Sequence, residues 1–109
     1  PEAEENSVEF RKELAATVTQ VTQQLDDFKL GLAADTVYNA FWHDFCDLRI
    51  ELTKSGELPR EDLAHGLETY LKLLHPFVPF VTEAIWQELA SELDFQEDLL
   101  ISASWPSVE

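Results

Sequence analysis

Two pairs of side chains have the types and spacing that metal chemistry requires. His43 and Cys46 lie three residues apart, and Asp62 and His65 repeat that spacing further along the chain. A zinc site needs four such ligands, however, and no second Cys/His pair follows the first. A di-iron site in a helical bundle needs two Glu-x-x-His pairs and two further glutamates, and this pattern is not met either. The spacing therefore predicts packing or surface roles for these side chains, and no metal site.

Nucleophilic and phosphate-transfer chemistry is expected to be absent for similar reasons. Cys46 is the only cysteine and stands beside Phe45 and near Trp42, where a thiol serves as a small hydrophobic group. The three glycines are isolated, so the chain has no glycine-rich phosphate loop. No serine stands in a nucleophile elbow. We therefore expect no catalytic residues, no enzymatic activity of this chain alone, and no cofactor of its own.

The seven basic residues are the groups able to bind phosphate, and all of them lie between positions 11 and 72. They are outnumbered by 22 acidic residues, which gives a formal net charge of −15. Proteins that bind nucleic acid usually carry a basic surface, so this charge favours a solvated acidic surface. It also argues against adhesion to an anionic membrane. Any contact with RNA would have to use a local cluster of these cations.

Hydrophobic spacing predicts the first two helices that position these groups. Steps of three and four residues place six side chains on one helical stripe: Phe10, Leu14, Val18, Val21, Leu25 and Phe28. A flexible lead-in is expected over 1–6, with Asn6 and Glu9 spaced as a capping pair and Gly31 as the helix breaker. A second helix over 32–54 carries a broad apolar face, on which we expect Trp42 and Phe45 to lie in the core.

The second half of the chain predicts two more helices joined by a proline corner. Pro59, followed by two acidic residues, marks the start of a helix that ends at His75. Pro76 and Pro79 disfavour helix at the residues before them, and Pro79 can open the next helix. The apolar stripe of that helix is formed by Val81, Ile85, Leu89 and Leu93. The tail over 99–106 alternates weakly, which indicates a short extended segment.

Together these elements predict an all-α fold, an antiparallel four-helix bundle with a short extended C-terminal segment, in a single domain over residues 1–109. An apolar content of 45% is enough for one compact core. No run of eighteen apolar residues exists, so no membrane span is expected. The acidic start and the single cysteine favour the cytoplasm. The absence of methionine, even at position 1, predicts that the chain begins inside a longer protein.

Two segments of the sequence resemble the anticodon-binding helical bundle of class I aminoacyl-tRNA synthetases, most of all valyl-tRNA synthetase. One is the corner segment YLKLLHPFVPFVTEAIWQEL at 70–89. The other is VYNAFWHDFCDLRIEL at 37–52, where the family pattern is matched by Tyr38, Trp42, Phe45, Cys46, Asp47, Glu51 and Leu52. The closing Ser104-Trp105-Pro106 is also similar, so the likeness covers about residues 8–106. The catalytic signatures of that family, HIGH and KMSKS, are missing.

The resemblance implies that this chain binds and positions the anticodon stem of tRNA as a fragment of a larger synthetase. The suspected parent would be a valine–tRNA ligase that uses ATP, magnesium and valine, and its catalytic domain would be a partner of this chain. In an up-down bundle, one end gathers a candidate nucleic-acid-binding patch: Arg11, Lys12, Arg49, Lys54 and Arg60. Lys29 and Lys72 are expected at the other end. The alternative hypothesis is an acidic helical module that docks another protein and binds no RNA.

Overall fold

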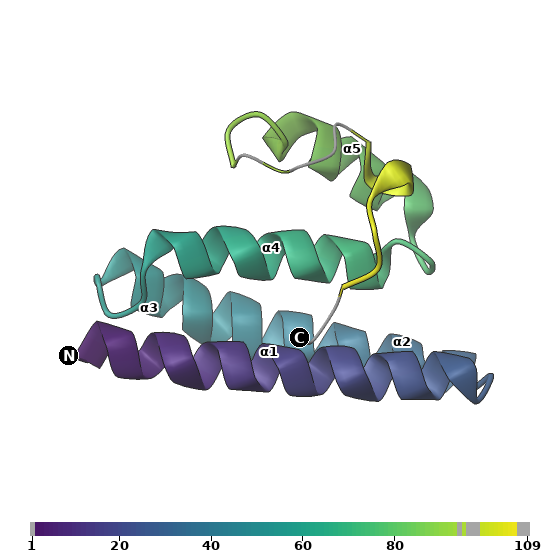
Figure 1. The fold of residues 1–109 in the computed structure, drawn as a ribbon, viewed down its shortest axis with the longest axis horizontal. Coiled ribbons are helices and arrows are strands. Elements are labelled where there is room, and N and C mark those ends of the chain that lie inside the picture. The colour runs from purple at the N-terminus through teal and green to yellow at the C-terminus, as the bar shows by residue number, and fades with distance from the viewer. Residues whose placement is uncertain (1, 94, 96–98, 107–109) are drawn as a thin grey trace.

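The computed structural model describes residues 2–93, 95 and 99–106, and every regular element within them is helical (Figure 1). The elements in chain order are α1 (Glu2–Asp26), α2 (Leu30–Asn39), η1 (Ala40–Arg49), α3 (Ile50–Lys54), α4 (Arg60–Leu74), α5 (Pro79–Leu89) and η2 (Leu100–Ser102). Because α2, the π-helix η1 and α3 follow one another without a gap, they form one continuous rod. The expected all-α fold of four helices is confirmed.

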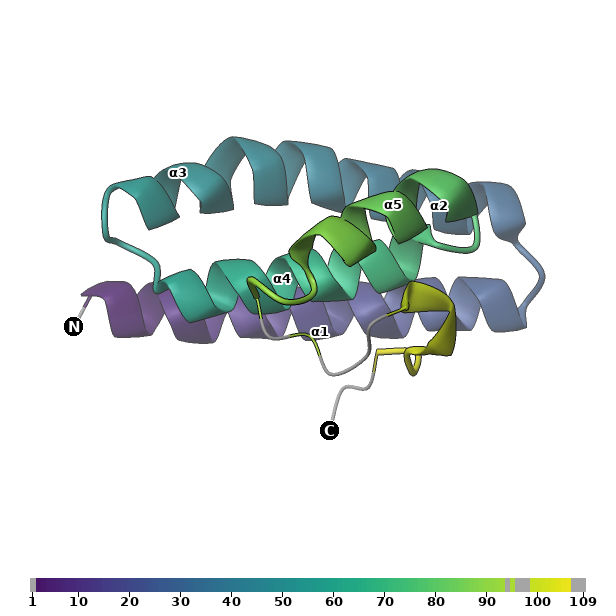
Figure 2. The same cartoon turned by 90° about the horizontal axis from the view of Figure 1, so that it is seen from above.

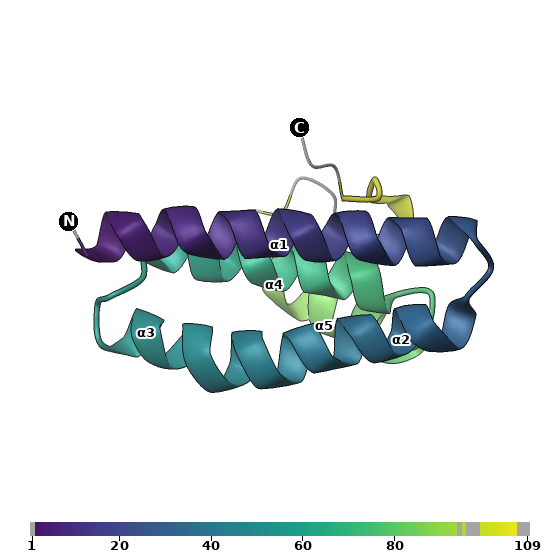
Figure 3. The same ribbon diagram turned by 90° about the horizontal axis from the view of Figure 1, so that it is seen from below.

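The structure consists of four helical rods. The first two form an antiparallel hairpin, and α4 and α5 are stacked on that hairpin. The rod α2–η1–α3 runs back alongside α1, and α4 lies over both in the same direction as α1 (Figures 1 and 3). The last helix, α5, crosses the outer face of α4 (Figure 2). As a result α4 is the central helix, which contacts α1, the second rod and α5.

The apolar side chains form two clusters that meet different faces of α4. The larger cluster joins α1, the second rod and α4 through side chains such as Phe10, Phe45 and Tyr70. The smaller cluster joins Leu71 of α4 to α5 and the tail, and its buried members are Leu71, Trp86, Ala90 and Leu100. The fourth helix therefore adds a core of its own to a body of three rods.

The predicted stripe of α1 is confirmed from Phe10 to Val21 but not at Phe28, which lies beyond the helix and is exposed, and the helix begins earlier than expected. Phe10, Leu14, Val18 and Val21 are all buried. The helix starts at Glu2, and acidic residues fill its first turn, where they suit the positive end of the helix dipole. Asn6 therefore lies inside the helix and not at its cap, and residues 2–6 are helical. Its Nδ2 donates a hydrogen bond to the backbone oxygen of Glu57 at 2.7 Å.

The turn between the first two rods is made by Phe28 and not by Gly31. The amide of Lys29 donates to the carbonyl oxygen of Gln24 at 2.8 Å, and the amide of Phe28 donates to that of Leu25 at 3.0 Å. This is the hydrogen-bond pattern of a Schellman motif, whose turning residue adopts a left-handed backbone. Phe28 takes that position with φ of 60°, and its side chain is 87% exposed. Gly31 lies within α2.

The π-helix η1 changes which side chains of the second rod face the core, because its wider turn alters the angular step between residues. Phe45 is buried as predicted, with its ring 6.0 Å from that of Phe10. Trp42, which was also predicted to be buried, is 51% exposed and stacks on Tyr38 at 6.5 Å. Across from η1, Gly66 of α4 is packed so closely that an added Cβ would lie 2.6 Å from each of the two phenylalanine rings.

The fourth helix buries a face that differs from the predicted one. Val81 and Ile85 were expected on the core side, yet both are exposed. Thr82 and Trp86 are buried instead. The reason is that the large indole of Trp86 fills the space beside α4, where its ring lies 4.3 Å from that of Phe95. The single largest side chain of the helix therefore decides which face is buried.

The corner after α4 is built as the prolines predict. The helix ends at Leu74, and Pro79 is the first residue of α5, where its missing N–H costs no helical hydrogen bond. The Nδ1 atom of His75 lies 3.0 Å from Oγ1 of Thr82. The imidazole thus connects the end of α4 to the beginning of α5.

The C-terminal tail holds α5 against the body. The carboxylate of Glu83 accepts hydrogen bonds from the first two backbone amides of η2, at 2.9 and 3.0 Å. The tail over 99–106 was expected to be extended throughout, but Leu100–Ser102 form a single 3-10 turn, and the backbone is extended at Leu99 and Ala103 on either side of it. The indole Nε1 of Trp105 then donates to Oγ1 of Thr22 at 2.8 Å. The tail therefore runs from α5 to α1.

Candidate nucleic-acid interface

The chain topology brings the predicted basic patch to one end of the molecule. The start of α1, the end of α3 and the start of α4 lie together (Figures 1 and 3). The hydrogen bond between Asn6 and the backbone of Glu57 joins the first of these to the loop between the other two. The prediction that these three helix ends share one end of the bundle is therefore confirmed. The side chains themselves, however, lie on different surfaces.

Arg49 is a buried structural residue, which corrects its predicted place in a surface patch. Its side chain is 2% exposed, and its guanidinium pairs with Glu13, with Asp44 at 3.4 Å and with Glu9 at 3.7 Å. The guanidinium also lies 5.5 Å from the centre of the Phe10 ring. Burial alone would lower the pKa of Arg49, but these carboxylates, Asp44 foremost, raise it above its ordinary value. Arg49 lies four residues after the buried Phe45, so both residues lie on the core side of the rod.

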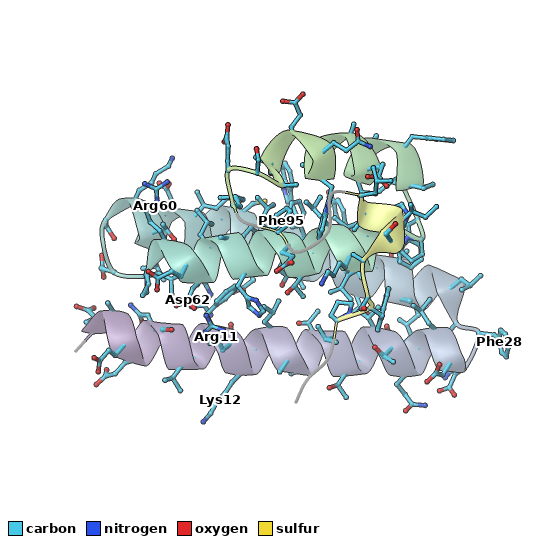
Figure 4. All side chains as sticks on the ribbon, turned by 45° about the horizontal axis from the view of Figure 1, so that its top comes forward. Arg11, Lys12, Phe28, Arg60, Asp62 and Phe95 are labelled. Atoms are coloured by element: carbon cyan, nitrogen blue, oxygen red, sulfur yellow. The ribbon has the colours of Figure 1, made fainter. Side chains whose placement is uncertain are left out.

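Lys54 and Arg60 lie at the expected end but on other surfaces. Lys54 is 72% exposed and pairs with Glu51 at 3.2 Å. Arg60 points away from α1 (Figure 4). It lines a groove of 480 Å³ together with three acidic side chains, Glu61, Glu68 and Glu92. That acidic majority disfavours an anion, and both basic residues remain predicted contacts only.

A groove between α1 and α4, which we call the α1–α4 groove, gathers four side chains that can carry positive charge. Arg11 and Lys12 come from α1, and His65 and Lys72 come from α4. The groove has a volume of 530 Å³, and Pro106 of the tail also lines it. Arg11 points across it toward α4, whereas Lys12 extends outward from α1 (Figure 4). The structure thus keeps two predicted residues together and adds two others.

Ion pairs hold two of these cations in place. A guanidinium nitrogen of Arg11 lies 2.6 Å from Oδ1 of Asp62, whose side chain is 2% exposed. The other oxygen of that carboxylate has no hydrogen-bond partner among the described residues. Lys72 pairs with Glu68 at 3.8 Å, one turn earlier on α4. Lys12 makes no ion pair with any residue that the structure describes. It is therefore the cation most open to a ligand.

The surroundings of His65 in the groove shift the pKa of its imidazole. Burial, followed by the positive charge of Arg11, lowers the pKa of His65 below its ordinary value. The carboxylates of Glu68 and Asp62 oppose this shift only in part. This shift favours the neutral form of the His65 imidazole.

The sequence prediction missed His65 and Lys72 as site residues. Its placement of Lys72 at the end opposite Arg60 is confirmed, because Lys72 lies in the last turn of α4, but it did not anticipate a groove that runs along the helices. The helices α1 and α4 run in the same direction (Figure 1), and the groove between them places Arg11 and Lys12 in line with α4 residues from His65 to Lys72 in the last turn. Positions 65, 68 and 72 lie on one helical face by their three- and four-residue spacing, and that signal was available in the sequence.

The lining of the α1–α4 groove carries more cations than carboxylates in a chain of net charge −15, and on its outer side Lys12 also borders Glu4, Glu5 and Glu9. The three permanent cations of the groove exceed the two carboxylates that pair with them, and a proton on His65 would add a further charge. Basic side chains of this kind provide most phosphate contacts in nucleic-acid complexes. The arrangement can therefore bind a phosphate group.

Other kinds of site find little support among the described residues. Residues 2–93, 95 and 99–106 contain no group of three or more His, Cys, Asp or Glu side chains that could hold a metal ion. Burial, and then the charge of Asp47, raises the pKa of the Cys46 thiol, which disfavours its reactive thiolate form. Within the same part of the chain, no helix has both the length and the apolar character that a membrane crossing needs.

The sequence has known relatives over most of its length. Residues 8–109 match the family described as the anticodon-binding domain of tRNA ligase. The chain is similar to valine–tRNA ligase of Carboxydothermus hydrogenoformans, with 43% identity over 101 residues that cover 85% of this chain and 11% of the relative. It is also similar to valine–tRNA ligase of Staphylococcus aureus, with 38% identity over 104 residues that cover 87% and 11%. The chain thus spans 11% of the length of these relatives.

Proposed function

The chain belongs to the family of anticodon-binding domains of tRNA ligases, and on this premise we propose that it binds the anticodon stem of a tRNA. Its role is positioning: it holds the stem so that the acceptor end reaches an active site in another part of a valine–tRNA ligase. The observation that carries this proposal is the family match over residues 8–109. The similarity to two valine–tRNA ligases supports valine as the amino acid.

The chemistry of aminoacylation, in this proposal, belongs to the rest of the parent ligase. ATP, magnesium and valine would be bound by its catalytic domain, which would be the direct protein partner of this chain. The anticodon-binding domain itself would need no cofactor. Its place of action would be the cytoplasm.

The α1–α4 groove supports the proposal as the place of RNA contact. Phosphate groups supply most of the non-specific affinity of a protein for nucleic acid, and they bind basic side chains. Arg11, Lys12 and Lys72 line this groove, and Lys12 extends outward from α1 (Figure 4). Arg49 is left out of the proposed interface because it is buried, and Lys54 and Arg60 are retained as further candidates at the same end.

Fluorescence anisotropy with a labelled tRNA transcript tests this interface. We would replace Lys12 and Lys72 together by alanine and spare Arg11, because its loss would leave the buried carboxylate of Asp62 unpaired. We expect weaker binding by the full chain, and a logarithmic salt slope that falls by about 0.7–0.9 for each phosphate that the variant no longer binds. Lys29→Ala is the matched control, since this lysine lies at the turn between α1 and α2, outside the groove.

Two other results would redirect the proposal. Normal binding by the double variant, with weak binding by Lys54→Ala and Arg60→Ala variants, would move the contact to the end of the bundle. Absence of salt-sensitive binding by the unchanged chain, even at low ionic strength, would favour the alternative hypothesis of an acidic module that docks another protein.

A further inference from the structure

His65 lies beside the basic side chains of the α1–α4 groove, and its imidazole makes no hydrogen bond to any residue that the structure describes. We infer that His65 binds a phosphate of the RNA backbone as an imidazolium, together with Arg11, Lys12 and Lys72, so that RNA binding takes up a proton. This inference deepens the proposed function and rests on it.

The geometry places His65 opposite the cations of α1. It stands on α4 two turns before Lys72, while Arg11 reaches across from α1 (Figure 4). A phosphate in the groove would therefore have Arg11 and Lys12 on one side and His65 and Lys72 on the other. Both nitrogens of a protonated imidazole are donors, which suits the acceptor oxygens of a phosphate.

The charges around His65 explain why its proton would come with the ligand. Facing it in the α1–α4 groove are Arg11, Asp62, Glu68 and Lys72. On its other side it lines the second groove, with Arg60, Glu61 and Glu92. The carboxylate of Asp62 is already engaged in an ion pair with Arg11, and that of Glu68 in an ion pair with Lys72. In the empty groove a proton on His65 would therefore be repelled by Arg11, and a bound phosphate would compensate that repulsion.

The expected linkage can be measured as a change in affinity with pH. A site that takes up one full proton on binding changes its affinity by up to about tenfold per pH unit. Because the phosphodiester itself does not titrate near neutral pH, the imidazole is the source of this dependence. We expect tRNA to bind the unchanged chain about five to ten times more tightly at pH 6 than at pH 8, within that limit.

Nuclear magnetic resonance of the full chain, labelled on its three histidines, tests the inference directly. The imidazole signals would be followed through pH titrations of the free chain, with a tRNA transcript, and with inorganic phosphate. We expect the pKa of His65 to rise when tRNA is added. His43 is the matched control, since it is exposed on η1 and lies 3.8 Å from Asp47, away from the groove.

The corresponding variants separate a ligand contact from a structural role. His65→Gln keeps a polar side chain but cannot titrate, so it should remove the pH dependence of tRNA affinity. His43→Gln should leave that dependence intact. If His65→Gln lowers the melting temperature and reduces tRNA binding equally at pH 6 and pH 8, the role of His65 is structural and the inference is overturned.

The remaining outcomes distinguish this inference from the proposed function. If tRNA binds equally well at both pH values and the His65 signal does not move, the inference fails and the proposed function stands. If no tRNA binds under any condition, both fail. If inorganic phosphate moves the His65 signal and tRNA does not, the groove is a site for small phosphate anions, and the assignment to RNA is overturned.

Discussion

The substitution Gly66→Ala should destabilise the fold, although alanine is the better helix former. An added Cβ at this position would lie 2.6 Å from Cζ of Phe10 and 2.6 Å from Cε1 of Phe45, and ordinary van der Waals contact begins at 3.4 Å. Each ring would have to retreat by about 0.8 Å, the difference between these distances. Both rings are 1% exposed and stack on one another, so neither has free space to enter.

The magnitude follows from two opposing effects. Overpacking a well-packed core costs about 1–3 kcal/mol, and the upper end applies here because two buried rings are displaced. Replacing glycine by alanine inside a helix stabilises the helix by about 1 kcal/mol. We therefore expect a net loss of about 2 kcal/mol in the free energy of unfolding. For a domain of this size that loss lowers the melting temperature by roughly 8–16 °C.

Urea and thermal unfolding, followed by far-UV circular dichroism, measure this loss. Gly31→Ala is the matched control, because it is also a glycine in a helix and nothing lies within 4 Å of its added Cβ. That variant should gain about 0.5–1 kcal/mol, the propensity difference alone. In the Gly66→Ala background, Phe10→Leu should recover part of the stability by removing one of the clashing rings. A Gly66→Ala variant as stable as the Gly31→Ala variant would refute the close packing of α4 against α1 and η1.

Four further predictions concern single side chains. Arg49→Ala should cost about 3 kcal/mol, which is the low end for a broken buried ion pair, because the carboxylate partners of Arg49 are partly exposed. An unchanged urea midpoint would contradict the burial of Arg49. Trp86→Ala should cost about 3–5 kcal/mol and the half-exposed Trp42→Ala about 1 kcal/mol, so equal losses on thermal unfolding would contradict their placement. Phe28→Gly should stabilise by about 0.5–1 kcal/mol, because glycine adopts a positive φ without strain; a lower melting temperature would show that the ring has a packing role. Burial alone would raise the pKa of Glu83, but two backbone amides hold it below its ordinary range. The stabilisation by this carboxylate is therefore present above the ordinary pKa of a glutamate and is lost as the pH falls through the lowered pKa. Glu83→Gln should flatten the acid side of the stability–pH curve. An unchanged curve would exclude this contribution.

The features that could be predicted from the sequence are those set by local spacing. The stripe from Phe10 to Val21 is a property of one helix, and it is buried as its period indicates. The corner at Pro79 depends only on the chemistry of proline, and α5 begins there. The order of the helix ends followed from short connections alone. None of these inferences required knowledge of which helix packs on which.

The features that could not be predicted depend on the helical step and on the neighbours of each helix. The exposure of Trp42 follows from the π-helical geometry of η1, whereas the expected face assumed an ordinary α-helix. The buried face of α5 was misassigned because, among the described residues, this helix packs mainly on α4 and the tail, so a single large side chain, Trp86, decides it. For the site, the presence of Lys72 and Arg11 in one groove required the lateral pairing of α1 with α4.

The division of the apolar interior into two clusters has a consequence for local unfolding. The smaller cluster, centred on Trp86, is joined to the body through α4 and through the hydrogen bond of Trp105 to Thr22. Such a unit can open by itself, so the amide hydrogens of α5 should exchange with solvent through an opening that leaves α1 protected. Nζ of Lys72 lies 6.0 Å from the centre of the Trp86 ring. Each opening of this unit would remove the contact between Lys72 and the Trp86 ring. The lifetime of the intact α1–α4 groove would then be set by how often the unit around Trp86, the least stable part of the chain, opens.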